Sequence, residues 1–159
     1  MVPDFKTYIG ESIWGDVQRR GMGVQKKKED EIEHLGFDGL YDLIRDTYKF
    51  PRFPLPLKNE TKDGHKYFSI GLFKYLYKIY RLTVSFKDNV IKEVLLFATK
   101  KDCEEFINIL CEKFNVDERT SGALSVTSKD GKVSNRLCMD VIETVLENSS
   151  EPLLTKREN

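Results

Sequence analysis

The sequence has few of the residues from which metal and redox sites are built. Among 159 residues it has two histidines, three cysteines and one tryptophan. No Cys-x-x-Cys or His-x-x-x-His spacing occurs, and a zinc site needs ligands clustered in this way. Three widely spaced cysteines also give no complete disulfide framework. We therefore predict no metal, no cofactor and no disulfide, with Cys103, Cys111 and Cys138 as buried free thiols in a reducing compartment.

The sequence also lacks an excess of charge of either sign. Its 26 Lys and Arg residues balance 26 Asp and Glu residues, so no net charge attracts the chain to nucleic acid or to an anionic membrane. No stretch approaches the ~20 apolar residues of a membrane span, and the first residues do not form a signal-peptide pattern. These absences predict a cytoplasmic protein without a membrane partner.

Common catalytic motifs are missing as well. The chain has no phosphate loop ending in Gly-Lys-Ser or Gly-Lys-Thr and no Gly-x-Ser-x-Gly nucleophile elbow. Paired carboxylates such as Glu104 with Glu105, or Glu143 with Glu147, are interpreted as solvated helix faces, because nothing in the sequence shows that two of them converge. We assign no catalytic residue, and an enzyme whose carboxylates are brought together only by the fold stays a lesser alternative.

The sequence does contain enough apolar residues for an ordered core, since 40% of them are hydrophobic, including ten Phe and seven Tyr. Apolar residues spaced every three or four positions predict helices, and strict alternation predicts strands. The predicted elements are, in chain order, helices over 4–20 and from Asp38 to Tyr48; strands over 67–70, 80–87 and 90–98; a helix from Thr99 or Asp102 to Phe114; a short hairpin over 124–133; and a helix over 137–145.

The segment 80–87 gives the clearest signal, because apolar and polar residues alternate along it, and Asp88-Asn89 follows as a hairpin turn. The predicted fold class is α+β, a mainly antiparallel sheet meander with helices packed on one face and an N-terminal two-helix extension. We divide the chain into a helical N-terminal extension (1–50), an α+β body (51–151) that folds with it as one cooperative domain, and a frayed tail (152–159).

The segment Phe50–Leu57 contains three prolines and cannot continue a helix, because each proline removes a hydrogen-bond donor and restricts the residue before it. We interpret it as an extended connection that leads to a turn at Asp63-Gly64. A proline run with an arginine could also be a ligand for an aromatic groove of another protein. A plain loop is the simpler interpretation.

One cluster near the N-terminus suggests recognition, because it combines a tryptophan with five basic residues that have no acid among them. Such a segment could bind phosphates or an acidic protein surface. Alternatively, the tryptophan attaches the first helix to the body, and the basic residues pair with the acids at 29–33 as a solvated charge run. The candidate binding residues are Trp14, Arg19, Arg20, Lys26, Lys27 and Lys28.

The segment from Ser12 to Gly21, with Lys28-Glu29-Asp30 and Phe37–Tyr41 after it, resembles uncharacterised small proteins of gut Bacteroidales and their phages. The resemblance lies within the first 50 residues. It implies neither a fold nor an activity. It does imply that the N-terminal segment is a reusable module on a variable body, and that the protein is virion-associated if it is encoded by a phage.

The leading functional hypothesis is a non-catalytic protein–protein interaction or assembly module, whose partner is another protein or a second copy of the chain. The first alternative is a nucleic-acid-binding protein that uses the basic cluster at residues 19–28. The second alternative is the enzyme with a carboxylate site, since a fold class alone does not exclude activity.

Overall fold

The computed structural model describes residues 31–157, apart from residues 105, 120 and 121. The chain divides into two compact units, residues 1–35 and residues 36–159. Of the first unit only residues 31–35 are described, and they form a short turn in which the Leu35 N–H donates to Ile32 O (3.2 Å). The helix predicted over 4–20 lies outside the described residues.

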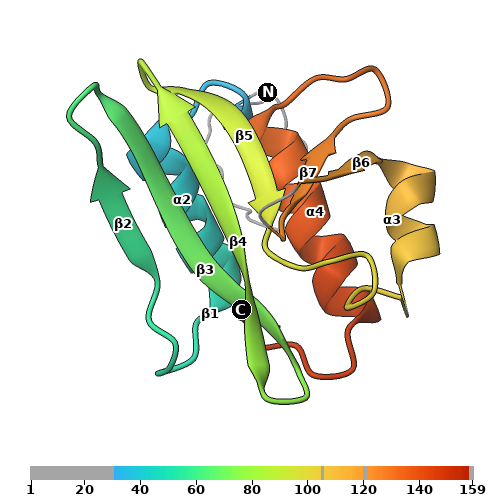
Figure 1. Ribbon diagram of the computed structural model, residues 1–159. Coiled ribbons are helices and arrows are strands. Elements are labelled where there is room, and N and C mark those ends of the chain that lie inside the picture. The colour runs from blue at the N-terminus through green and yellow to red at the C-terminus, as the bar shows by residue number, and fades with distance from the viewer. Residues whose placement is uncertain (1–30, 105, 120–121, 158–159) are drawn as a thin grey trace, which may run out of the picture. The chain divides into compact units, whose positions relative to one another are not determined.

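The second unit combines helices with a mainly antiparallel sheet, which confirms the α+β class (Figure 1). Its main sheet has the strand order β2-β3-β4-β5-β7-β6, and β1 and β8 form a separate pair. The helices are α2 (Phe37–Thr47), α3 (Ile107–Lys113) and α4 (Asn135–Asn148). The strands are β1 (Tyr48–Lys49), β2 (Leu57–Glu60), β3 (His65–Tyr75), β4 (Lys78–Lys87), β5 (Val90–Leu96), β6 (Asn115–Glu118), β7 (Leu124–Thr127) and β8 (Thr155–Lys156).

Strands β3, β4 and β5 form the predicted antiparallel meander. The alternation in β4 holds in the structure, with Leu82 and Val84 fully buried and Thr83 between them partly exposed. Asp88 and Asn89 connect β4 to β5 with φ angles of 53° and 62°. Two consecutive positive φ angles are typical of the type I′ turn that suits a two-residue hairpin, so the predicted turn is confirmed.

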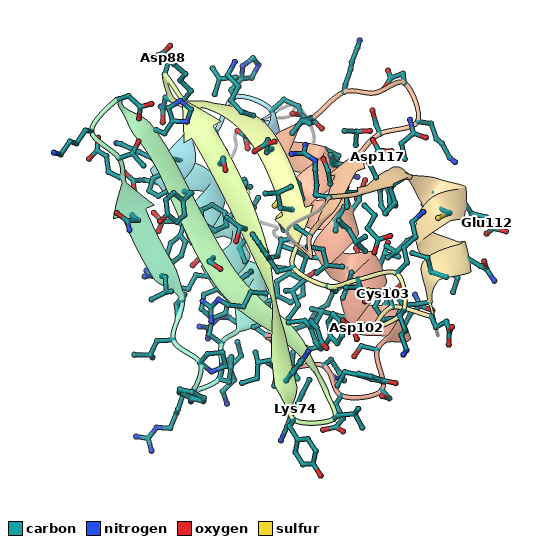
Figure 2. The ribbon with its side chains drawn as sticks, in the orientation of Figure 1. Lys74, Asp88, Asp102, Cys103, Glu112 and Asp117 are labelled. Carbon is teal, nitrogen blue, oxygen red and sulfur yellow. The ribbon has the colours of Figure 1, made fainter. Side chains whose placement is uncertain are left out.

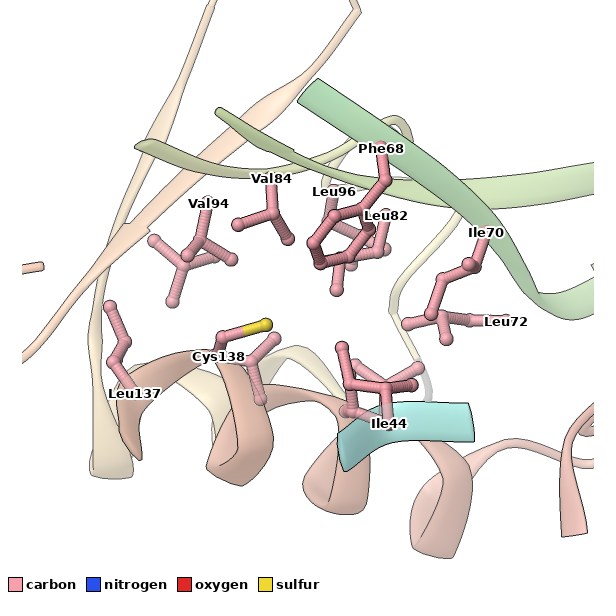
Figure 3. Packing of buried hydrophobic residues seen from close by; sticks show 14 of the residues in the cluster. Ile44, Phe68, Ile70, Leu72, Leu82, Val84, Val94, Leu96, Leu137 and Cys138 are labelled. Atoms are coloured by element: carbon pink, nitrogen blue, oxygen red, sulfur yellow. The ribbon is translucent and has the colours of Figure 1, made fainter. Parts of the chain in front are cut away.

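Helices α2 and α4 cover one face of the main sheet, which we call the core face. In Figure 3, Ile44 of α2 and Cys138 of α4 point toward Phe68, Leu82 and Leu96 of the strands, and all five side chains are buried. Each large apolar side chain buried in this way contributes ~1.5–3 kcal/mol relative to an exposed one. The opposite face, which we call the outer face, is turned toward the viewer in Figure 1.

The turn between β4 and β5 also fixes the beginning of α2. The Phe37 N–H, one of the helix donors without an intrahelical acceptor, donates to Asn89 Oδ1 (2.9 Å). Gly36 makes this approach possible, because a Cβ there would lie 2.1 Å from the Asn89 amide nitrogen. A side chain far away in the sequence therefore replaces the local cap that α2 lacks.

The helix predicted from Thr99 or Asp102 begins later than expected. Residues 100–104 form turns, and α3 starts at Ile107. Thr99 and Asp102 cap the turn reciprocally, since the Thr99 N–H donates to Asp102 Oδ2 (3.3 Å) and the Asp102 N–H to Thr99 Oγ1 (3.1 Å). Cys103 therefore precedes the helix, and Cys111 is exposed, so the prediction of three buried thiols is wrong for Cys111.

The hairpin predicted over 124–133 is also wrong in its pairing. Strand β7 is present, but it pairs with β5 and with β6, and Val133 is not in a strand. The Ser128–Lys132 turn, in which the Gly131 N–H donates to Ser128 O (2.8 Å), leads into α4. The sequence did not indicate β6, because three of its four residues are polar and exposed.

The last described residues are paired, although we predicted fraying there. Strand β8 pairs with β1, and Leu154 before it is buried. The Arg157 guanidinium adds a hydrogen bond from Nε to Arg45 O at the end of α2 (2.8 Å). Upstream of these, the Leu153 N–H donates to Leu72 O on β3 (2.8 Å), which continues the edge of the main sheet beyond β2.

Candidate recognition surface beside strand β2

The six predicted binding residues, Trp14, Arg19, Arg20, Lys26, Lys27 and Lys28, all lie outside the described residues. Within the described part of the chain, no three His, Cys, Asp or Glu side chains converge as a metal site would require. Of the paired acids of α4, Glu143 Oε2 accepts from Lys156 Nζ (3.3 Å) and Glu147 is exposed. No helix among the described residues is long and apolar enough to cross a membrane.

A different surface stands out in the segment that the sequence indicated as a loop. Phe53, Leu55 and Leu57 are 76%, 65% and 57% exposed, while Pro54 between them is buried and Pro56 is partly buried. Residues 52–54 form a bend before β2, and the burial alternates along the segment, so the prolines face the body of the unit and the larger apolar side chains face solvent. We call residues 53–57 the proline strip.

The proline strip is held against the main sheet at two points. Pro54 packs on Gly71 of β3, where an added Cβ would lie 2.7 Å from Pro54 Cγ. Leu55 O accepts a hydrogen bond from Arg81 Nη2 on β4 (3.1 Å). The exposed side chains of the strip therefore extend from a fixed backbone.

Strand β2 directs the end of the strip toward the outer face. Lys58 Nζ lies 4.5 Å from the centroid of the Tyr41 ring on α2, so Lys58 faces the helices. Its neighbour Leu57 pairs with Ser69 and points the other way. Leu57 therefore belongs to the outer face.

The backbone edge of β2 is a poor template for another strand. β2 is a terminal strand of the main sheet and is four residues long. Pro56 has no N–H to donate, and the Glu60 N–H already donates to Asn59 Oδ1 (2.7 Å). Short edges with proline are typical of sheets protected against edge pairing. Contacts with a partner at this place must therefore use the exposed side chains.

Arg81 is the cation that donates a hydrogen bond to the proline strip. Its Nε donates to Ser69 Oγ (2.9 Å), and its Nη2 donates to Ser69 O (2.8 Å) and Leu55 O (3.1 Å). All three acceptors are neutral. No described carboxylate lies within 4.0 Å of the guanidinium. Glu93, the acid of β5 on this face, lies opposite Ser85 and pairs with Arg119 (3.2 Å). Burial lowers the pKa of Arg81 from its ordinary value.

The hydroxyl groups beside Arg81 leave a further donor available. The Thr83 hydroxyl donates to Ser69 Oγ (3.2 Å), which also accepts from Arg81 Nε. Two hydroxyls have two hydrogens, and one of these is used between them. The second hydrogen and the two N–H groups of Arg81 Nη1 have no acceptor among the described residues. The exposed part of Arg81 therefore keeps free donors, while the spare hydroxyl hydrogen is on Ser69, which is buried.

Two other exposed apolar residues help to define the surface. Phe97, 39% exposed, follows β5, and its N–H donates to Arg81 O (2.8 Å), so it lies across from Arg81 on the next strand. Val90, 54% exposed, adjoins the β4–β5 turn. Figure 2 shows Asp88 of that turn and Lys74 of β3 at opposite ends of the sheet. Val90 is exposed and apolar like the strip residues but lies at the β4–β5 turn, so it serves as a control for the strip.

Comparisons with protein-family models, with curated proteins and with solved structures found no match. The function must therefore be inferred from the geometry of the chain itself.

Sequence reasoning raised the proline run as a possible ligand segment but preferred a plain loop, and it did not single out Leu55, Leu57 or Arg81. The available signal was the order Phe-Pro-Leu-Pro-Leu, in which apolar side chains and prolines alternate. The burial of the segment follows this order, with the prolines covered and the larger side chains exposed. Nothing in the sequence indicated that the larger side chains face solvent, because that depends on Pro54 packing against Gly71.

Proposed function

We propose that the chain is a non-catalytic protein–protein interaction module that binds a segment of another protein through the proline strip. The supporting observation is the exposure of Phe53, Leu55 and Leu57 on a backbone that Pro54 and Arg81 hold in place. Contiguous exposed apolar patches are unusual on monomeric proteins and mark interaction sites. An exposed aromatic residue such as Phe53 is also a suitable anchor for a partner.

A segment of another protein fits this surface better than a second copy of the chain. Stable dimers bury ~800 Å² on each partner, whereas the strip offers three neighbouring side chains. The backbone of β2 also offers few donors, because Pro56 lacks an N–H and Asn59 takes the N–H of Glu60. The strip therefore binds a short segment through side-chain contacts.

The cluster of Trp14 with the basic residues at 19–28 is a separate proposal, for contact with the same partner or with nucleic acid. It rests on the sequence alone. A variant with Lys26, Lys27 and Lys28 changed to alanine tests it independently of the strip.

The experiment selects peptides from a random-peptide display library on the immobilised full chain. We then measure the affinities of the selected peptides for the wild type, for a Leu55→Ser/Leu57→Ser variant and for the control Val90→Ser. Losing two buried apolar contacts, at ~1.5 kcal/mol or more for each side chain, should weaken binding of the strip variant by about a hundredfold. Val90→Ser should bind as the wild type does.

Three outcomes would contradict the proposal. The selection yields no binding peptide, the strip variant binds as tightly as the wild type, or sedimentation shows that the strip variant dissociates a wild-type dimer. The last result would assign the surface to a second copy of the chain.

A further inference from the structure

We infer that the segment bound by the proline strip carries a carboxylate, which Arg81 receives on the outer face of the sheet. This inference rests on the proposed function, since it names the chemistry of the same partner. It predicts a peptide in which an acidic residue is flanked by apolar residues.

The charge around Arg81 supports this choice of partner. The guanidinium is partly buried, and its three acceptors are the hydroxyl of Ser69 and two backbone carbonyls, so its charge has no described counter-ion. Partly buried cations are costly unless they are paired, and hydrogen bonds between charged groups are among the strongest in proteins. A carboxylate from a partner would supply the missing charge.

Arg81 and the hydroxyls beside it keep hydrogen-bond donors that a carboxylate could use. Arg81 Nη1 has two N–H groups without a described acceptor, and the pair of Ser69 and Thr83 hydroxyls keeps one hydrogen. A carboxylate is an acceptor only, with two oxygens that can each take more than one hydrogen bond. A neutral amide would offer one acceptor oxygen and would place its own NH₂ donors against these donors.

The position of Arg81 connects this anion site to the apolar strip. Arg81 Nη2 holds Leu55 O, so the guanidinium lies directly beside the strip. On its other side, Phe97 follows β5 and is exposed. An acidic side chain at Arg81 would therefore have apolar surfaces of this chain on both sides.

A purely structural role of Arg81 predicts a different result. If Arg81 only holds the strip in place, its loss should weaken every peptide that contacts the strip by the same factor. If it receives a carboxylate, its loss should remove the preference for acidic peptides over neutral ones. The preference between two peptides that differ in one group is therefore the informative measurement.

The experiment uses two synthetic peptide libraries with identical apolar positions and either Glu or Gln at the centre. Their binding is measured to the wild-type chain, to Arg81→Gln, to Arg81→Lys and to the control Arg119→Gln, whose guanidinium is already paired with Glu93. We expect the wild type to prefer the Glu library about tenfold, as for a hydrogen bond to a charged group. The preference should disappear in Arg81→Gln and persist in Arg119→Gln. It should fall in Arg81→Lys, because a lysine ammonium has fewer donors than a guanidinium and cannot bond Ser69, Leu55 O and a carboxylate at once.

Equal binding of both libraries to the wild type would overturn the inference and leave the proposed function intact. Binding of neither library would overturn both. An unchanged preference in Arg81→Gln would also overturn the inference. If Arg81→Gln does not fold, two other measurements test the inference. The preference for the Glu library should be smaller in Arg81→Lys, and in the wild type it should decrease as the salt concentration increases.

Discussion

The two faces of the main sheet consist of the same strands, but they differ in how far packing and hydrogen bonds within the chain satisfy their side chains. On the core face, Phe68, Val84 and Leu96 are fully buried against α2 and α4, and each is satisfied by packing alone. On the outer face, Ser69 and Arg81 keep hydrogen-bond donors that no described acceptor uses. The side chains of the core face are buried on folding, whereas the outer face keeps hydrogen-bond donors that folding leaves without a described acceptor.

The proline strip extends this difference to the edge of the sheet. In most of the unit the large apolar side chains face inward, but in the strip Pro54 faces inward and Phe53 and Leu55 face outward. Exposed apolar side chains contribute little to stability. Substitutions on the two sides should therefore have very different effects on the free energy of unfolding.

The largest effect is expected for Phe68→Ala on the core face. The Phe68 ring contacts the rings of Phe37 and Tyr41 on α2, with centroids 5.8 Å and 5.4 Å away, and is fully buried. Truncation of a buried phenylalanine costs ~3–5 kcal/mol of unfolding free energy. Chemical denaturation followed by circular dichroism measures this loss.

The neighbouring residue on the outer face provides the control. Tyr67 is partly exposed and its hydroxyl accepts from Asn59 Nδ2 (3.1 Å), so Tyr67→Ala should cost about 1 kcal/mol or less. Equal costs for Phe68→Ala and Tyr67→Ala would show that the two faces do not differ as described.

A smaller effect is expected at Asn89, where the sheet holds α2. Asn89→Ala removes the acceptor of the Phe37 N–H and places an alanine at a φ of 62°, so it should cost ~1–2 kcal/mol. Asn89→Gly removes the same acceptor but tolerates this φ, and should cost less. If Asn89→Ala has no effect on the denaturation midpoint, the cap does not stabilise α2.

A pH-dependent effect is expected at Asp102, beside Tyr80 of the core face. Burial opposes ionisation of Asp102, but hydrogen bonds from Thr99 and Tyr80 and the charge of Lys78 more than offset it, so its pKa lies below the ordinary value of 3.8. A lowered pKa contributes stability that is complete above 3.8 and is lost as the pH falls through the folded-state pKa. The denaturation midpoint, measured as a function of pH, should therefore fall more steeply in acid for the wild type than for Asp102→Asn. The same dependence of the midpoint on pH in both proteins would contradict this.

The smallest effect on stability is expected in the proline strip. Leu57→Ser replaces a side chain that is mostly exposed, so the unfolding free energy should change by about 0.5 kcal/mol or less. Denaturation of Leu57→Ser and Val90→Ser should give midpoints close to that of the wild type. A loss of several kcal/mol in Leu57→Ser would mean that the strip is part of the fold.

The sequence predicted those parts of the fold that depend on local pattern. Alternation along 80–87 predicted β4, and Asp88-Asn89 predicted its turn, because both signals are contained within a few residues. The sequence did not predict that β7 pairs with β6, since pairing depends on the whole sheet. The late start of α3 at Ile107 was missed for a similar reason, because Thr99 and Asp102 stabilise a turn in place of a helix.

The candidate site depended even more on distant contacts. Arg81 was visible only as the polar member of an alternating strand, and its role beside the strip requires Leu55 O, 26 residues away, to reach it. The predicted site at Trp14 and the basic residues was inferred from a local signal, a cluster of charge within a short segment. The two sites make separable predictions for where a partner binds.

Nuclear magnetic resonance of the isotope-labelled full chain, titrated with a selected Glu-containing peptide, tests the central claim most directly. We predict that the largest chemical-shift changes occur in the backbone amides of residues 53–57, apart from the prolines, and in the side-chain Nε–H of Arg81. Changes confined to the indole N–H of Trp14 and to residues 19–28, or centred on the β4–β5 turn, would contradict the claim that the proline strip and Arg81 form the recognition surface.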